Sequence, residues 1–463
     1  MNSELEAIII KLGLPNLLKL SQDDAVDELS TKYRRKLAIN KISINKFKNS
    51  KVTIEAPPAS NSLLHTLPTN LPYKPFKHQI DAFDFYHERE NKRLIIADEM
   101  GLGKTFTALM IAKSECLKVV VICPASLKMV WVRESEKFGI TCEIFSYEKC
   151  PTRIDSDYFL IVDEAHYCQN PKSQRTNKVY QLSLHAYAVL LLTGTPMRNG
   201  KPHNLFAILK IIEHPITNNK YEFEKRYCDA KKTHFSAWDI SGASNLPELK
   251  AKISNALIQR KKDDCLDLPP KIYSDIYITP EKKDMINYFE MLNDMGDDNS
   301  LVKLTRIRVF NSHIKIPFIL KYLENFDDSL VIFSPFKTTV TLLADRLGVT
   351  PFTGDTSLDE RNQIIEKFQK GESKIFIGTI GSGGVGVTLH IANHLIIIDP
   401  PLTPGDYHQA CDRIHRIGQS RVCNIYNLRC LHIDNYIYDM ISNKDSVIES
   451  SIPKILTGLK NAR

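Results

Sequence analysis

The chain has 463 residues, of which 43% are hydrophobic and 25% are charged, and its formal net charge is +7. These values are ordinary for a globular protein of two or three domains, and no apolar run reaches the roughly 18 residues that a membrane helix needs. The ten cysteines include no Cys-x-x-Cys pair and the histidines show no finger-like spacing, so neither a zinc site nor a disulfide framework is indicated. The mildly positive charge permits nucleic-acid binding without proving it.

The first 70 residues differ in composition from the rest, and we predict that residues 1–70 form a basic accessory segment. The stretch from Thr31 to Lys51 contains eight lysines and arginines, no acid, and the aromatic residues Tyr33 and Phe47. Such a stripe suits a nucleic-acid backbone, and a solvated amphipathic face explains it equally well. Several prolines between Ala56 and Pro75 indicate a linker. The beginning of the chain lacks the basic region and the cleavage site of a secretory signal, so we expect an intracellular protein.

From Tyr73 onward, short apolar runs alternate with helical segments, which predicts parallel sheets covered on both faces. Residues 71–265 should form a first lobe with a helical insertion after the TGTP motif, residues 266–300 a connector, and residues 301–463 a second lobe. The strands expected in the first lobe are RLIIA, KVVVICP, CEIFSY, YFLIVDE and AVLLLTGTP. Those expected in the second lobe are SLVIFS, GVTPFTGD, SKIFIGT, HLIIIDP and VCNIYNLR. The predicted fold class is therefore α/β, with two parallel-sheet lobes in tandem.

The sequence ADEMGLGKT, which ends at Thr105, lies between a predicted strand and a predicted helix, as a phosphate-binding loop does. Gly101 and Gly103 would let backbone N–H groups approach phosphate oxygens, and Lys104 would supply a charge for the β- and γ-phosphates of ATP. Thr105 would place its hydroxyl on Mg²⁺. The alternative is a chance glycine turn.

A second buried run, Tyr158 to Val162, ends at two carboxylates, Asp163 and Glu164. In a phosphate-loop enzyme, the first acid after such a strand holds Mg²⁺, and a neighbouring acid orients or deprotonates the attacking water. The alternative is that the two acids only cap the helix that follows. The preceding Gly-Lys-Thr sequence favours the catalytic interpretation.

The second lobe has no phosphate loop of its own, but the stretch from Gln409 to Ser420 contains two arginines three residues apart. On a helix, Arg413 and Arg416 would share one face, where two guanidinium groups could brace a γ-phosphate during transfer. A pair of surface arginines is more often only solvated. Because the first lobe carries the phosphate loop, we interpret this pair as an arginine finger that reaches across a cleft to it. The cleft would then close when ATP is bound and relax after hydrolysis.

Eight motifs follow one another between about Tyr73 and Leu428. They are FKHQ, DEMGLGKT, VVVICPASLKMVWVRE, DEAH, LLTGTP, FTGD, GSGGVGVTLHIANHLIIIDP and QACDRIHRIGQ. Together they resemble the ordered motifs of a superfamily-two helicase of the Swi/Snf type. The resemblance implies two RecA-like lobes, ATP and Mg²⁺ as cofactors, and a DNA-dependent ATPase. Asp98 stands where the general phosphate-loop pattern has a glycine, but in this family the position is normally not glycine.

The same resemblance implies roles for further residues. Gln79 would recognise the adenine, and Gly386 would lie beside the nucleotide in the site that Arg413 and Arg416 complete. Coupling of hydrolysis to DNA movement is implied for Thr193, Gly194, Thr195 and Gln409. Contacts with the DNA backbone are implied for Ser126, Lys128, Asn199, Thr353, Gly354 and Thr379, although such residues at strand ends are more often plain loop residues.

The segment from Arg226 to Lys250 is similar to the corresponding insertion of the annealing-helicase group, which rewinds DNA and remodels stalled forks. We therefore predict an ATP-dependent translocase on double-stranded DNA that acts on branched DNA. Its work would be branch migration, fork regression or strand annealing in replication, recombination or repair. One alternative is a conventional strand-separating helicase acting on DNA or RNA, and another is a non-catalytic DNA-binding clamp.

Two stretches depart from the larger relatives, because PPLTPGDYH replaces the usual Trp-Asn-Pro and GTIGSGGVGVT differs from the usual glycine motif before it. These departures affect the expected DNA contacts rather than ATP hydrolysis. The chain ends soon after the second lobe, so we expect a minimal DNA motor that meets branched or duplex DNA and replication or repair proteins, and no membrane. The expected compartment is a bacterial or viral-host cytoplasm. A nucleus is the alternative, because KYRRK also fits a nuclear signal.

Overall fold

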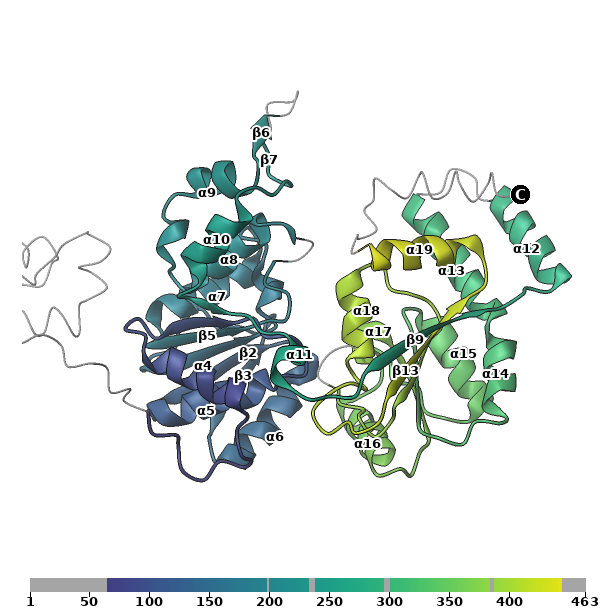
Figure 1. Ribbon diagram of the computed structural model, residues 1–463, viewed down its shortest axis with the longest axis horizontal. Helices are drawn as coiled ribbons and strands as arrows, with labels where there is room; N and C mark the ends of the chain where they lie inside the picture. The colour runs from purple at the N-terminus through teal and green to yellow at the C-terminus, as the bar shows by residue number, and fades with distance from the viewer. Residues whose placement is uncertain (1–64, 198–199, 233–237, 295–299, 384–386, 444–463) are drawn as a thin grey trace, which may run out of the picture. The chain divides into compact units, whose positions relative to one another are not determined.

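The computed structural model describes residues 65–197, 200–232, 238–294, 300–383 and 387–443. The predictions for the basic stretch and for most of the linker fall on residues 1–64, outside this range. Among the described residues, no helix is both long enough and apolar enough to cross a bilayer. Two large parallel sheets, each with helices packed against it, make up most of this part of the chain (Figure 1).

The first sheet has six parallel strands in the order β3-β2-β4-β5-β1-β8. Every residue of three of its central strands is buried, as a parallel sheet covered on both faces requires. All five strands predicted for the first lobe are present, and β8 is an addition. The strands are β1 (Arg93–Ile96), β2 (Lys118–Cys123), β3 (Cys142–Ser146), β4 (Tyr158–Asp163), β5 (Ala188–Leu192) and β8 (Leu257–Ile258).

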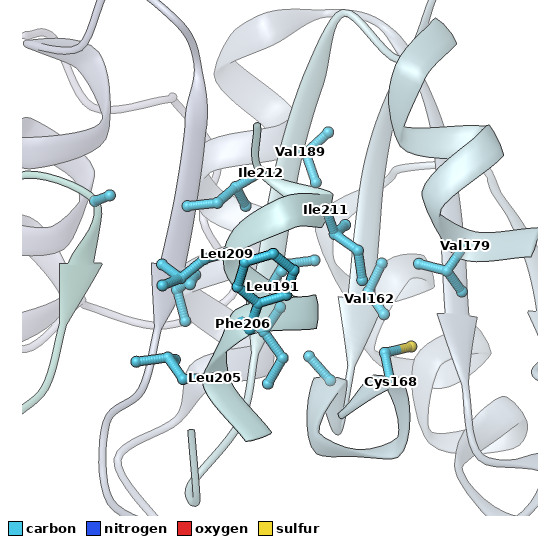
Figure 2. Packing of buried hydrophobic residues seen from close by; sticks show 14 of the residues in the cluster. Val162, Cys168, Val179, Val189, Leu191, Leu205, Phe206, Leu209, Ile211 and Ile212 are labelled. Atoms are coloured by element: carbon cyan, nitrogen blue, oxygen red, sulfur yellow. The ribbon is translucent and has the colours of Figure 1, made fainter. Parts of the chain in front are cut away.

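The helices around the first sheet pack into two separate hydrophobic clusters, one on each face. Along β4, alternate residues join different clusters, so that Leu160 belongs to one and Ile161 to the other. Helices α4 (Lys77–His87), α5 (Lys104–Glu115) and α6 (Lys128–Phe138) build one cluster. The other is built by α7 (Gln174–His185), α8 (His203–Ile211), α9 (Lys220–Tyr227) and α10 (Leu246–Ile253). Figure 2 shows this second cluster, in which Phe206 and Leu209 of α8 pack with Leu191 of β5.

Most of the segment after the TGTP motif is helical, as predicted, because it contains α8, α9 and α10. The short antiparallel hairpin formed there by β6 (Lys231–Lys232) and β7 (Trp238–Asp239) was not predicted from the sequence. The remaining short elements are η3 (Ala125–Leu127), η4 (Ala165–Cys168), η6 (Pro215–Thr217) and α11 (Lys262–Cys265).

The second sheet has five parallel strands in the order β11-β10-β12-β13-β9. Its strands are β9 (Lys271–Tyr277), β10 (Leu330–Ser334), β11 (Ile375–Thr379), β12 (His394–Ile397) and β13 (Cys423–Arg429). The helices that accompany it are α12 (Lys282–Asn293), α13 (Ser300–Ile314), α14 (Ile316–Leu323), α15 (Lys337–Leu347), α16 (Leu358–Gln369), α17 (Ile380–Gly383), α18 (Pro404–Cys411) and α19 (His432–Ser442). Phe333 and Ile332 of β10 point into different clusters, so this sheet is also covered on two faces. The α/β class with two parallel-sheet lobes is confirmed.

Two predictions for the second lobe need correction. Residues 266–300 were expected to be a connector, yet Lys271–Tyr277 is the edge strand β9, because it pairs with β13 along seven residues. GVTPFTGD is not a strand, and only Phe352 forms an isolated bridge, to Gly378. Pro351, directly before it, has no N–H to donate to a ladder. The bridge needs the glycine, because a Cβ at Gly378 would lie 3.0 Å from the Phe352 carbonyl oxygen.

Candidate active site

The phosphate loop connects β1 to α5, where the sequence predicted it. Gly101 and Gly103 have φ angles of +89° and +75°, in the left-handed region that favours glycine. Space is limiting as well, since a Cβ at Gly103 would lie 2.6 Å from Gln79 Nε2. Gln79 is 3% exposed and donates to the Leu102 carbonyl oxygen at 3.3 Å, so the residue predicted to recognise adenine lies directly against the loop.

Lys104 is the first residue of α5, and its ammonium group turns back over the loop. Its Nζ donates to the carbonyl oxygens of Asp98 and Glu99 at 2.7 and 3.4 Å. Burial lowers the pKa of Lys104, and the negative charges of Glu164 and Asp163 oppose that shift. The lysine therefore lies close to the predicted metal ligand Asp163 and to the predicted catalytic Glu164, and half-buried Thr105 follows it in the first turn of α5.

The two carboxylates lie at the end of β4 in different environments. Asp163 accepts hydrogen bonds from the Glu164 backbone N–H and from the Trp131 indole N–H, both at 2.9 Å. Glu164 has a φ of +52°, and its Oε2 lies 3.1 Å from Nδ1 of His166. This pair of acids is thus held by the strand end, a buried tryptophan and a histidine of the same DEAH motif.

The pKa values of these two acids move in opposite directions. Burial raises the pKa of Asp163, and the nearby charge of Glu164 adds to the shift. Burial by itself would also raise the pKa of Glu164, but the nearby His166 ring and the charges of Lys104 and Arg413 outweigh it and lower that pKa. Glu164 is therefore the carboxylate that remains ionised most readily, which suits a group that accepts a proton from water.

Arg413 and Arg416 come from the second lobe, and they do not lie on a helix, which was the condition for the two to share one face. Helix α18 ends at Cys411, and both arginines lie in the turn that follows. Arg413 is 2% exposed and donates to the Val387 carbonyl oxygen at 3.3 Å, while Arg416 donates to Thr388 Oγ1 at 3.1 Å. Packing against a neighbouring loop, rather than a helix, thus holds the two guanidinium groups.

Both arginines nevertheless reach the first lobe. The Arg416 Cγ atom lies 3.5 Å from the position of a Cβ on Gly101. Burial lowers the pKa of each guanidinium group, and the charge of Glu164 acts on both in the opposite direction. The structure therefore brings the arginine pair, the phosphate loop and the second carboxylate together, as predicted from their sequence motifs.

The predicted coupling residues lie beside this site. Thr193 is fully buried, and its Oγ1 accepts from the Thr195 N–H at 3.1 Å. A Cβ on Gly194 would lie 3.1 Å from the Met100 side chain, so this turn packs directly on the phosphate loop. Gln409 lines a cleft of about 1510 Å³ together with Glu164, Gly194 and Thr195.

The residues predicted to contact DNA are only partly brought together. Ser126, in η3, lines a separate cleft of about 750 Å³ with Arg133 and Arg361, and Lys128 begins α6 next to it. Thr353 is 3% exposed, and its Oγ1 accepts from the Asp355 N–H at 3.3 Å, so this hydroxyl stabilises its own loop. Thr379 ends β11 and is 9% exposed, and the carbonyl oxygen of Gly354 accepts from Arg361 at 3.1 Å. Asn199 and Gly386 lie outside the described residues.

Two basic residues of the segment that links the sheets, Arg260 and Lys262, also contact the phosphate loop, and no motif in the sequence had pointed to them. Arg260 donates through its Nε to Asp98 Oδ1 at 2.9 Å, and it also binds the His78 carbonyl oxygen. Lys262 donates through its backbone N–H to Glu99 Oε2 at 2.8 Å, and its Nζ lies 2.7 Å from Asp412 Oδ1. These residues lie about 160 positions from the loop they contact, and the acid at position 98 is the one sequence signal that could have pointed to them.

Asp98 is therefore the partner of Arg260, not a defect of the phosphate loop. We expect Asp98→Gly, which restores the general loop pattern, to lower the free energy of unfolding by about 2–3 kcal/mol, because Arg260 loses a charged acceptor. Thermal unfolding followed by circular dichroism measures the change. Asp98→Asn keeps one acceptor oxygen and should lose less. An Asp98→Gly protein as stable as the wild type would contradict this role.

The donor set at the site fits a magnesium nucleotide. The described residues contain no group of three histidine, cysteine or acidic side chains that could hold a metal ion by themselves. Mg²⁺ is commonly bound by one or two protein groups together with substrate phosphates, so a carboxylate (Asp163) and a hydroxyl (Thr105) beside a phosphate loop are sufficient.

Two family models match the chain. The SNF2-related domain matches residues 78–152 and 146–321, and the helicase conserved C-terminal domain matches residues 314–418. The solved SWI2/SNF2 ATPase core of Sulfolobus solfataricus in complex with double-stranded DNA is 23% identical, with a TM-score of 0.41, and the match covers 86% of this chain and 97% of that one.

Several curated proteins are similar along most of the chain. The SWI/SNF-related matrix-associated actin-dependent regulator of chromatin subfamily A-like protein 1 of Xenopus laevis is 28% identical over 421 residues, which are 80% of this chain and 43% of that protein. The human DNA annealing helicase and endonuclease ZRANB3 is 27% identical, over 85% of this chain and 42% of that protein. A protein of Bacillus subtilis (strain 168) that is named uncharacterized ATP-dependent helicase YqhH is 25% identical, over 84% of this chain and 81% of that protein. The chain thus spans less than half the length of the first two of these relatives.

Because the SNF2-related model alone covers more than half of the chain, and the helicase model follows it, this chain belongs to the SNF2-related family of helicase-type ATPases.

Proposed function

We propose that the protein is an ATP-driven translocase on double-stranded DNA that acts on branched DNA. One observation carries the proposal: a single site combines a phosphate loop and an acid pair from one sheet with an arginine pair from the other. A site assembled in this way is complete only when the two lobes are close together. ATP binding and hydrolysis would therefore change how the lobes grip a substrate.

The residues of the site divide the chemistry among them. Lys104 binds the β- and γ-phosphates. Thr105 and Asp163 would hold Mg²⁺, which would neutralise charge on the phosphates. Glu164 accepts a proton from the attacking water, with His166 holding its carboxylate in place. Arg413 and Arg416 stabilise the charge that develops on the transferred phosphoryl group.

Movement on DNA would follow from the elements next to this site. The turn that contains Thr193 and Thr195 packs on the phosphate loop and shares a cleft with Gln409 of α18. Ser126 in η3 and Lys128 at the start of α6 are our candidates for contacts with the DNA backbone. Because backbone contacts dominate such a grip, binding should weaken with salt and depend little on sequence.

The preference for branched DNA rests on the segment from Arg226 to Lys250. In the structure this segment links α9 to α10, and its ends are joined by an ion pair between Arg226 and Glu248 and by the Tyr227 hydroxyl, 3.0 Å from Glu248 Oε1. A relative that shares 27% identity is named a DNA annealing helicase.

We propose residues 1–70 as the segment that recognises the junction. Deletion of these residues should remove the preference for branched DNA, and an unchanged preference would contradict this role.

Steady-state ATP hydrolysis tests the proposed function. We expect strong stimulation by linear duplex, and stronger stimulation by a model fork and a four-way junction, with the stimulated rate lost in Lys104→Ala. Stimulation by single strands or RNA alone would favour a conventional strand-separating helicase. DNA binding without hydrolysis on any of these substrates would favour a non-catalytic clamp.

A further inference from the structure

A buried tryptophan connects the start of α6 to the first carboxylate of the site. Trp131 is fully buried in the cluster formed with α4 and α5, and its indole Nε1 donates to Asp163 Oδ2 at 2.9 Å. Trp131 lies less than one helical turn after Lys128, the first residue of α6, and η3 with Ser126 directly precedes that helix. The Trp131 side chain thus connects α6, which begins beside the cleft of about 750 Å³, to Asp163, which lies beside the phosphate loop.

The bond restricts how Asp163 can be oriented. Its Oδ1 accepts from the Glu164 N–H and its Oδ2 from Trp131, so each carboxylate oxygen has one fixed donor. The indole nitrogen can only donate, which makes the contact unambiguous in direction. Partners of this kind orient metal-binding carboxylates, and their loss typically costs 10–100-fold in metal affinity or activity.

Packing alone does not require this contact. Phe138 and Phe159 fill the same cluster as buried aromatic residues without a polar group. A phenylalanine at position 131 would provide most of the same apolar surface, whereas the indole N–H serves only the carboxylate. The contact therefore serves the orientation of Asp163.

We propose that Trp131 is a positioning residue that holds Asp163 ready for Mg²⁺ and transmits the position of α6 to it. This inference rests on the proposed function, in which Asp163 binds the metal and the start of α6 meets the DNA backbone. Contact of DNA with Ser126 and Lys128 would shift or brace α6, and the indole would carry that change to the carboxylate. This link from α6 through Trp131 to Asp163 gives a physical reason why ATP hydrolysis would depend on DNA.

The chain contains two tryptophans, which provides a direct optical test. Trp238 is 46% exposed and lies on the β6–β7 hairpin, so the full-length Trp238→Phe protein leaves Trp131 as the one remaining indole. Adding Mg²⁺ with ADP should change the emission of Trp131, and Asp163→Asn in the same background should abolish the change. If calorimetry shows that Mg²⁺–ADP binds while the emission stays constant, the link between Trp131 and Asp163 is overturned.

The kinetic test compares Trp131→Phe with Phe138→Leu, which removes a similar amount of buried surface from the same helix and cluster. We expect Trp131→Phe to raise the Mg²⁺ concentration for half-maximal hydrolysis by about 10-fold or more. It should also reduce the ratio of DNA-stimulated to basal activity, while DNA affinity is unchanged. Equal Mg²⁺ and DNA dependence in the two variants would show that Trp131 is only a core residue. If the wild-type enzyme itself is not stimulated by DNA, the proposed function fails, whereas the optical test still decides whether Trp131 reports on Asp163.

Discussion

Replacing Arg416 with alanine should lower the DNA-stimulated rate of ATP hydrolysis by about 10³-fold or more, the usual effect of removing an arginine that stabilises phosphoryl transfer. Arg416 comes from the second lobe, yet its side chain lies 3.5 Å from the position of a Cβ on Gly101 of the phosphate loop. The loss should fall on kcat, with a small change in KM, because the guanidinium group acts mainly on charge that develops in the transition state. Steady-state kinetics over a range of ATP concentrations separates the two.

Two matched variants make this expectation specific. Arg416→Lys keeps the charge but loses the planar fork of donors, so its rate should remain closer to that of the alanine variant than to the wild type. Arg421→Ala removes another arginine of the same lobe, whose exposed side chain pairs with Asp328, and should leave the rate close to the wild type. Equal activity of Arg416→Ala and Arg421→Ala would contradict the assignment.

The second large effect concerns stability. Lys315 is fully buried between α13 and α14, and its Nζ lies 3.0 Å from Asp399 Oδ1 and 2.9 Å from Asp434 Oδ2. Lys315→Met keeps most of the side-chain length but leaves two buried carboxylates without their cation. We expect a loss of about 3–5 kcal/mol in the free energy of unfolding, as when one partner of a buried ion pair is removed. Denaturation in urea, followed by far-UV circular dichroism, measures this loss.

Lys337→Met is the matched control, because Lys337 pairs with Asp355 at the surface, where such a pair contributes about 0–1 kcal/mol. The pH dependence gives a second check. Burial alone would lower the pKa of Lys315, but the charges of Asp399 and Asp434 outweigh it and raise the pKa. A raised lysine pKa stabilises the folded state below the unfolded value of about 10.4, and this contribution is lost as the pH rises through the folded value. The difference between wild type and Lys315→Met should therefore shrink at strongly alkaline pH, and a constant difference would contradict this account.

The sequence predicted most of the strands and the parts of the site that lie next to strands. The run YFLIV is apolar at every position because both faces of a parallel sheet are buried, so β4 and the two acids at its end could be located from local pattern alone. The phosphate loop could be located equally well from the sequence, because its glycines and its lysine act on backbone groups only a few residues away. The prediction failed for GVTPFTGD and for residues 271–277, where strand pairing is decided by a partner far along the chain.

The sequence by itself determined the class of fold, the order of the motifs and the identity of the groups that we propose for nucleotide binding, because these depend on short-range periodicity and on residue chemistry. Only the tertiary structure decided that Arg413 and Arg416 lie in a turn, that Asp98 pairs with Arg260, and that Trp131 holds Asp163. Each of these three features depends on residues that are distant in the sequence or on packing that orients a side chain. A hydrogen bond of this kind depends on where whole elements meet, and no local pattern of residues records that position.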